Sequence, residues 1–183
     1  MRELVVSEWL TLDGVFDSDT MNEWFQPYES DGRNAYIKEN VDTSDAVLLG
    51  RVSYEMLAAY WPNQKDDAFG IAGRLNRMPK YVVSSSLKAA AWSNTTIIRD
   101  NVVERIGELK RQPGKDIIVF GSGALVQSLM RAGAVDEYRL LVHPHIAGRG
   151  KRFYRDGMDA EKLSLAESRS IGKGVLLLRF RAG

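Results

Sequence analysis

The segment Gly121-Ser122-Gly123 is the strongest candidate for a ligand site in the sequence. The apolar run 117–120 before it predicts a buried strand, and the apolar spacing after it predicts a helix that ends near Gly133. Glycines let backbone N–H groups approach a pyrophosphate, and the N-terminus of a helix attracts its negative charge. Val126 takes the place of the third glycine of the Rossmann fingerprint, and the acidic ribose ligand expected about twenty positions further on is missing. The segment therefore predicts a phosphate-binding turn of another kind, with an ordinary strand-to-helix turn as the alternative.

Gly50 marks a second place where a buried strand gives way to a helix. The strand is predicted over 46–49 and the helix over 53–60. Arg51 can form a bidentate contact with a phosphate, and the Ser53 hydroxyl and the helix amides can add to it. The alternative is a capped helix start beside a solvated arginine.

Two further polar segments follow predicted strands. Ser84 and Ser85 come after the strand 81–83, and their hydroxyls suit a phosphate or a ribose, although serine clusters often only mark loops. Asp13 follows the first strand and opens a long stretch, 11–27, that lacks periodicity. Its carboxylate can bind the N–H groups of a heterocycle, or it can simply form an Asp-Gly turn.

Other chemistries find little support in the sequence. Cysteine is absent, which excludes disulfides, thiolate catalysis and cysteine metal sites. His143 and His145 would share one face of a strand, but we find no third ligand and expect no metal site. Ser122 lacks the Gly-x-Ser-x-Gly elbow of a serine hydrolase, so hydrolysis is the least favoured chemistry.

Strands and helices alternate along most of the chain. Strands are predicted over 4–10, 46–49, 81–83, 95–98, 117–120 and 138–146, and helices over 28–41, 53–60, 67–76, 101–111 and from Gly123 onward. Asn101 is the expected N-cap of its helix. Residues 162–169 and 175–180 predict a closing antiparallel hairpin. This order indicates a mainly parallel sheet with helices on both faces, whose ligands bind at the carboxyl ends of the strands.

The totals predict a single domain over residues 1–183. Apolar residues make up 44% of the chain and charged residues 27%, as in ordinary globular proteins. The net charge of +1 gives no general attraction to nucleic acid. No apolar run approaches the roughly 18 residues of a membrane span, and the N-terminus lacks the pattern of a signal peptide. We therefore expect a cytoplasmic protein with no nucleic-acid or membrane partner.

In this order along the chain, the four polar segments resemble the dihydrofolate-reductase-like superfamily. The similarity is closest to the reductase domain of the bifunctional riboflavin-biosynthesis deaminase-reductase and to its stand-alone bacterial relatives. The matching segments are Ser7–Val15 (SEWLTLDGV), Leu48–Met56 (LLGRVSYEM), Lys80–Leu87 (KYVVSSSL) and Ile117–Tyr154. The resemblance implies a three-layer α/β domain with a central, mostly parallel sheet of about eight strands and an antiparallel C-terminal hairpin. It also implies a homodimer.

The resemblance further implies that NADPH lies across the strand ends. The residues that would hold it are Gly50, Arg51, Ser53, Ser84, Ser85, Gly121, Ser122, Gly123, Ala124 and Leu125. Ser53 stands where the family usually has threonine and keeps the hydroxyl. Ser85 stands where a basic residue often follows the first serine, so NADH remains open as the cofactor. The deaminase zinc motif is missing from the sequence.

The expected function is an NADPH-dependent reductase that transfers a hydride to a small heterocyclic substrate, pyrimidine- or pteridine-like. Asp13 is the candidate catalytic residue, for substrate orientation or proton relay. Trp9, Trp24 and Phe25 either form an aromatic lid over the substrate or belong to the core. Because the acidic residue that contacts the pterin in true dihydrofolate reductases has no match, we do not expect folate reduction. A regulatory protein that binds NADP(H) without turnover is the alternative.

Overall fold

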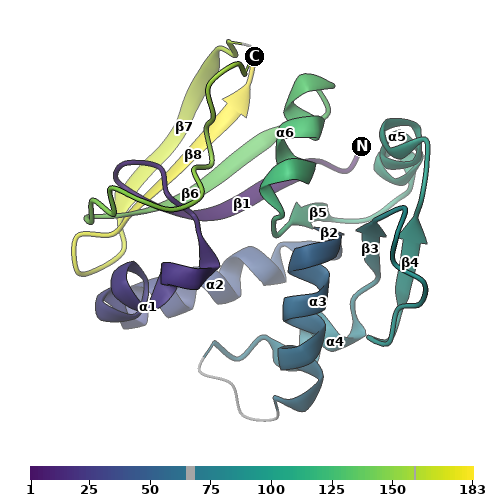
Figure 1. Ribbon diagram of the computed structural model, residues 1–183, viewed down its shortest axis with the longest axis horizontal. Coiled ribbons are helices and arrows are strands. Elements are labelled where there is room, and N and C mark those ends of the chain that lie inside the picture. Colours follow the sequence, from purple (N-terminus) through teal and green to yellow (C-terminus); the bar gives the residue numbers. More distant parts are fainter. Residues whose placement is uncertain (65–68, 159) are drawn as a thin grey trace.

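The protein is one three-layer α/β domain with a central eight-stranded sheet (Figure 1). The computed structural model describes residues 1–64, 69–158 and 160–183. The strand order is β4-β3-β2-β5-β1-β6-β8-β7. The strands are β1 (Leu4–Thr11), β2 (Ser44–Gly50), β3 (Lys80–Val83), β4 (Thr95–Ile98), β5 (Asp116–Val119), β6 (Glu137–His143), β7 (Leu163–Ser170) and β8 (Leu176–Ala182).

The six strands β1 to β6 run parallel, and β8 pairs antiparallel with both β6 and β7. The mostly parallel sheet and the antiparallel C-terminal hairpin expected from the sequence are therefore confirmed. Short apolar runs form the inner strands, because an inner strand of a parallel sheet is buried on both faces and needs apolar side chains on both.

Helices cover both faces of this sheet. They are α1 (Met21–Trp24), α2 (Asp31–Asp42), α3 (Arg51–Tyr60), α4 (Ala72–Arg77), α5 (Val102–Arg111) and α6 (Gly123–Arg131). One buried cluster joins α2, α3 and α4 to one face of the sheet, and another joins α5 and α6 to the opposite face. Figure 1 shows these two groups of helices on either side of the sheet. None of the helices within the described ranges combines the length and apolarity of a bilayer span.

Strand β1 shows how one strand serves both clusters. Leu4, Val6 and Leu10 lie in the cluster with α6, whereas Trp9 packs against the cluster with α2. Successive side chains of a strand point to opposite faces, so Glu8 belongs to the series that faces α6.

Several predicted boundaries were wrong. The stretch 11–27 is not one irregular loop, since it contains the short helices Ser18–Thr20, α1 and Gln26–Tyr28. Strand β6 ends at His143, and the helix predicted over 28–41 begins only at Asp31, where the Ser30 hydroxyl accepts from the Arg33 N–H at 3.2 Å. A polar cap thus outweighed the apolar pattern.

Three further helix starts differ from the prediction. α3, predicted over 53–60, begins at Arg51. Asn101 has a left-handed backbone with φ of 47° and makes no side-chain cap bond. Asparagine suits this position because it tolerates the left-handed conformation, not because its side chain caps the helix. The helix predicted over 67–76 is α4, which begins at Ala72; positions 67 and 68 lie outside the described residues.

The strands β1 and β5 meet at a topological switch point. They pair only from Leu4 to Val6 and from Ile117 to Val119. Beyond that, β1 continues to Thr11 alongside β6, whereas β5 has ended. The chain after β1 leads to α2 on one face, and the chain after β5 leads into α6 on the other. Ligands of open parallel sheets bind outside the carboxyl ends of the strands at such a point.

Candidate functional site

Gly50 and Gly121 bring two strand-to-helix turns together at the carboxyl edge of the sheet. The Gly50 N–H donates to the Gly121 carbonyl at 3.2 Å. A Cβ atom at position 50 would lie 2.2 Å from the Ser122 Oγ, and one at position 121 would lie 2.5 Å from the Ser53 Oγ. Gly121 also has a positive φ of 59°, which disfavours other residues. The two turns approach this closely because both positions lack side chains.

Two helices begin at this contact. α3 starts at Arg51 with Gly50 as its N-cap, and α6 starts at Gly123 with Ser122 as its N-cap. Neither N-cap residue makes a side-chain bond to the helix amides. The amides of the first turn carry partial positive charge, which favours an anion. The structure thus brings the Gly50–Ser53 and Gly121–Leu125 segments of the sequence prediction to one place.

The serine segment lies at the end of the next strand, since Val83 pairs with Gly50. The Ser84 Oγ accepts from the N–H groups of Ser86 at 3.2 Å and Leu87 at 2.9 Å. Ser84 is buried and shapes this turn, while Ser85 is exposed. The segment is therefore adjacent to the Gly50 turn, and both Ser85 and Ser86 are exposed.

A basic side chain reaches Ser85 from the neighbouring edge strand. The Arg99 guanidinium follows β4 and lies 3.4 Å from the Ser85 carbonyl and 3.5 Å from the Lys88 carbonyl. Arg51, by contrast, pairs with Glu55 at 2.8 Å on the surface of α3. Arg99 was not predicted as a site residue, because it reaches Ser85 only through the pairing of β4 with β3.

Asp13 holds a loop in place. Its carboxylate accepts from the Thr11 hydroxyl at 2.6 Å and from the N–H groups of Ala147 at 3.0 Å and Gly148 at 2.9 Å. The Thr11 hydroxyl, followed by these amides, lowers the pKa of Asp13 to about 2. An ionised carboxylate with its oxygens so occupied favours positioning of the 147–148 backbone over proton transfer.

The aromatic residues proposed as a lid lie mostly in the core. Trp24 and Phe25 are buried, and Phe25 stacks on Trp9 at 4.2 Å between ring centres. The ring of His143 packs beside both Trp24 and Phe25, and its Nδ1 lies 3.1 Å from the Leu10 carbonyl. Burial lowers the pKa of His143 to about 4, so the ring is neutral. Across the described ranges, no three His, Cys, Asp or Glu side chains are grouped to hold a metal ion.

Glu8 was missed by the sequence analysis and lies under the Gly121 turn. Its Oε1 accepts from the Gly121 N–H at 2.8 Å, and the residue is only 9% exposed. Burial raises the pKa of Glu8 to about 8, and the Gly121 N–H opposes this shift. The available signal was a carboxylate in the same alternating series as Leu4, Val6 and Leu10.

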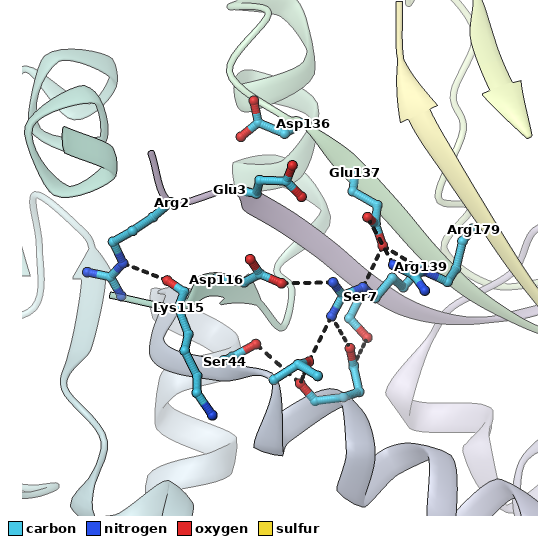
Figure 2. A network of polar contacts seen from close by, with 12 residues as sticks. Arg2, Glu3, Ser7, Ser44, Lys115, Asp116, Asp136, Glu137, Arg139 and Arg179 are labelled. Atoms are coloured by element: carbon cyan, nitrogen blue, oxygen red, sulfur yellow. Dashed lines mark hydrogen bonds and ion pairs between the residues drawn. The ribbon is translucent and has the colours of Figure 1, made fainter. Parts of the chain in front are cut away.

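A second polar cluster lies at the amino ends of β5 and β6, away from the glycine turns (Figure 2). The Arg139 guanidinium contacts Glu137 at 2.6 Å and Asp116 at 2.8 Å, and Arg179 also pairs with Glu137. Each of these charges has an opposite partner, and removal of one partner would leave an uncompensated charge within the sheet. An open surface groove nearby is lined by residues of α2 and by Lys115 and Asp116.

The chain is similar to several known proteins. The uncharacterised protein YyaP of Bacillus subtilis (strain 168) is 28% identical over 177 residues, covering 96% of this chain and 92% of that protein. A Shewanella sp. PV-4 structure ascribed to riboflavin biosynthesis is 14% identical with a TM-score of 0.78, covering 99% of each chain. A diaminohydroxyphosphoribosylaminopyrimidine deaminase/5-amino-6-(5-phosphoribosylamino)uracil reductase from Thermotoga maritima is 16% identical with a TM-score of 0.69. It matches 100% of this chain and 57% of that chain.

The family model described as the RibD C-terminal domain matches residues 2–177, which include both glycine turns, the serine segment and Asp13. The chain belongs to the RibD C-terminal domain family.

Proposed function

We propose that this protein is an NADPH-dependent reductase that transfers a hydride to a small heterocyclic substrate. The observation that carries the proposal is the meeting of two helix N-termini, without side-chain caps, at Gly50 and Ser122. Both turns lie at the carboxyl edge of a parallel sheet, next to the switch point between β1 and β5, and membership of the RibD C-terminal domain family supports the same chemistry.

The residues at this place fit a dinucleotide. A pyrophosphate needs close backbone approach, which Gly50 and Gly121 allow, and N–H groups without an intrahelical partner, which the first turns of α3 and α6 supply. Ser53, Ser85 and Arg99 supply hydroxyls and positive charge along the same edge for the adenosine end. When bound, the reduced nicotinamide supplies the hydride. The chain itself contributes binding, orientation and exclusion of water, which is most of what hydride transfer requires from a protein.

The description of one solved structure supports the proposed substrate class. The Thermotoga maritima neighbour is described as a uracil-derivative reductase, which favours a pyrimidine-like or pteridine-like ring for this chain. Asp13 fixes the 147–148 backbone beside the end of β1. We assign Asp13 the role of positioning the 147–148 backbone, not that of transferring a proton.

Two titrations test the proposal. NADPH should quench tryptophan fluorescence with saturation, and NADPH oxidation at 340 nm should accelerate with an aminouracil or pteridine substrate. Absence of saturable binding of both NADPH and NADH contradicts the proposal. Arg105→Ala is a matched control, because Arg105 pairs with Glu108 on the distant surface of α5.

A dinucleotide-binding protein without turnover is the second candidate. The ionised, fully bonded state of Asp13 favours it, because the residue expected to relay a proton holds backbone amides instead. Saturable NADPH binding with no oxidation across the substrate panel would select this candidate.

We also propose a homodimer that acts in the cytoplasm, with the exposed face of the C-terminal hairpin as the contact. Leu165 of β7 is 60% exposed and Leu176 of β8 is 44% exposed, on the side where Leu178 and Phe180 are only partly buried. Large apolar side chains left open on a sheet favour association. Sedimentation velocity should show a dimer, and Leu165→Lys should shift it to a monomer; a monomeric wild type contradicts this.

A further inference from the structure

Glu8 is a buried acid at the centre of the sheet. It lies on β1, where it pairs with Leu140 of β6, just beyond the point where β5 has ended. Its side chain therefore points toward the α6 face at the switch point, directly under the Gly121 turn. The Oε1–Gly121 distance of 2.8 Å joins it to the same turn that the proposed function assigns to pyrophosphate.

The other charged and titratable groups on the elements around Glu8 are engaged elsewhere. On β5 and β6, Arg139 pairs with both Asp116 and Glu137 at the amino end, and the Tyr138 hydroxyl donates to Glu161. On α3, Arg51 pairs with Glu55, and the Tyr54 hydroxyl accepts from the Trp92 N–H. His143 faces the α2 side, and Arg131 lies at the far end of α6. Within the described residues, the one hydrogen bond to the Glu8 carboxyl comes from Gly121.

A carboxyl in this position has two states with different consequences for an anion. Its ionised form places a negative charge next to the Gly121 amide, where it would repel a bound phosphate group in surroundings that screen charge poorly. Its neutral form still accepts the Gly121 N–H through the carbonyl oxygen and adds no charge. The hydrogen bond therefore survives protonation, while the repulsion does not.

We propose that Glu8 is a proton-linked positioning residue that holds the Gly121 turn and takes up one proton when a dinucleotide binds. The inference rests on the proposed function, because it needs a phosphate group at this turn. The proton comes from solvent, and no bond other than O–H forms. The pKa of about 8 in the free protein places this linkage in an accessible range.

Linkage gives the sign of the pH effect. Below pH 7 Glu8 is already neutral, so the Kd for NADPH is flat. Above pH 8 the proton must be taken up on binding, so the Kd rises by up to tenfold per pH unit. The variant Glu8→Gln keeps an oxygen acceptor for Gly121 and carries no charge, so its Kd should stay flat to pH 9.5. Glu104→Gln, an exposed carboxylate on α5, should keep the wild-type profile.

The experiment is NADPH titration of the wild type, Glu8→Gln and Glu104→Gln from pH 6.5 to 9.5. Calorimetry of the wild type at pH 8.5, in two buffers of different ionisation enthalpy, counts protons without relying on a variant. Uptake approaching one proton and a flat Glu8→Gln profile support the proposal. Saturable binding with no proton uptake, or a Glu8→Gln profile as steep as that of the wild type, overturns it and leaves the proposed function standing. Absence of NADPH binding at every pH overturns both.

Discussion

Gly50 lies so close to Ser122 that a Cβ atom at position 50 would stand 2.2 Å from the Ser122 Oγ and 3.1 Å from its backbone nitrogen. This approach brings together the N-cap residues of α3 and α6, which lie on opposite faces of the sheet. The hydroxyl could rotate away from a methyl group, but the backbone nitrogen could not, so any side chain at position 50 must push the turns apart.

Gly50→Ala should therefore weaken NADPH binding at least tenfold and lower the free energy of unfolding by about 1–3 kcal/mol, the usual range for overpacking. Adding Ser122→Ala should restore part of the stability, because it removes the closest atom. Fluorescence titration and urea unfolding measure the two effects. Wild-type affinity in Gly50→Ala would show that the two turns do not share a ligand.

Arg99 should set the preference for NADPH over NADH. Its guanidinium lies beside Ser85 with only backbone carbonyls as partners among the described residues, whereas Arg51 is neutralised by Glu55. A charge-assisted contact contributes about 1.5–3 kcal/mol, so Arg99→Ala should raise the Kd for NADPH tenfold or more and that for NADH less than twofold. Equal loss for both nucleotides would assign Arg99 a role in folding instead. Arg51→Ala should show a smaller difference in the same assay.

Glu8 should also make stability depend on pH in the free protein. Its folded pKa is about 8 and its ordinary value is 4.5, so the folded state holds the proton more tightly. The stability that the neutral Glu8 contributes is therefore fully present below about pH 4.5. It is lost as the pH rises toward 8, by about 1.4 kcal/mol per pH unit. Buried His143 changes stability in the opposite direction. Its folded pKa is lowered from 6.5 to about 4, so its contribution to stability is lost as the pH falls. The difference between wild type and Glu8→Gln in urea unfolding isolates the Glu8 effect, and a constant difference from pH 5 to 9 would refute it.

Asp13→Asn separates an anchoring role from a proton relay. The asparagine oxygen can accept only part of what the carboxylate accepts from Thr11, Ala147 and Gly148, so unfolding should become easier by about 1 kcal/mol. Because the folded pKa is lowered to about 2, the wild-type advantage is present above pH 4 and disappears as pH falls toward 2. Turnover should drop modestly. A hundredfold loss of kcat with unchanged stability would restore Asp13 as the proton donor.

The two strands and the turns that follow them could be predicted from the sequence, because a glycine directly after a short apolar run is typical of a buried strand that ends in a turn. The runs 46–49 and 117–120 became β2 and β5, and both following turns reached the same edge. Where local chemistry competed with the pattern, the prediction failed: Asn101 adopts a left-handed turn and makes no cap bond, and β6 ends at His143.

Contacts that depend on the order of the strands in the sheet could not be predicted from the sequence. Arg99 reaches Ser85 only through the pairing of β3 with β4, and Glu8 reaches Gly121 only because β5 ends beside β1. Both depend on strand order, which a single sequence does not state. Asp13 was predicted as a polar residue at the end of a strand. Its partners Ala147 and Gly148 could not be predicted, because they lie far from it along the sequence.

The most direct test of the proposed dinucleotide site is an amide NMR titration of the wild-type protein with NADPH. The N–H signals of Arg51, Gly121, Ser122, Gly123 and Ala124 should shift together and saturate at one Kd. Absence of saturable shifts, or shifts confined to the groove around Lys38 and Lys115, would contradict a dinucleotide site at the two helix N-termini.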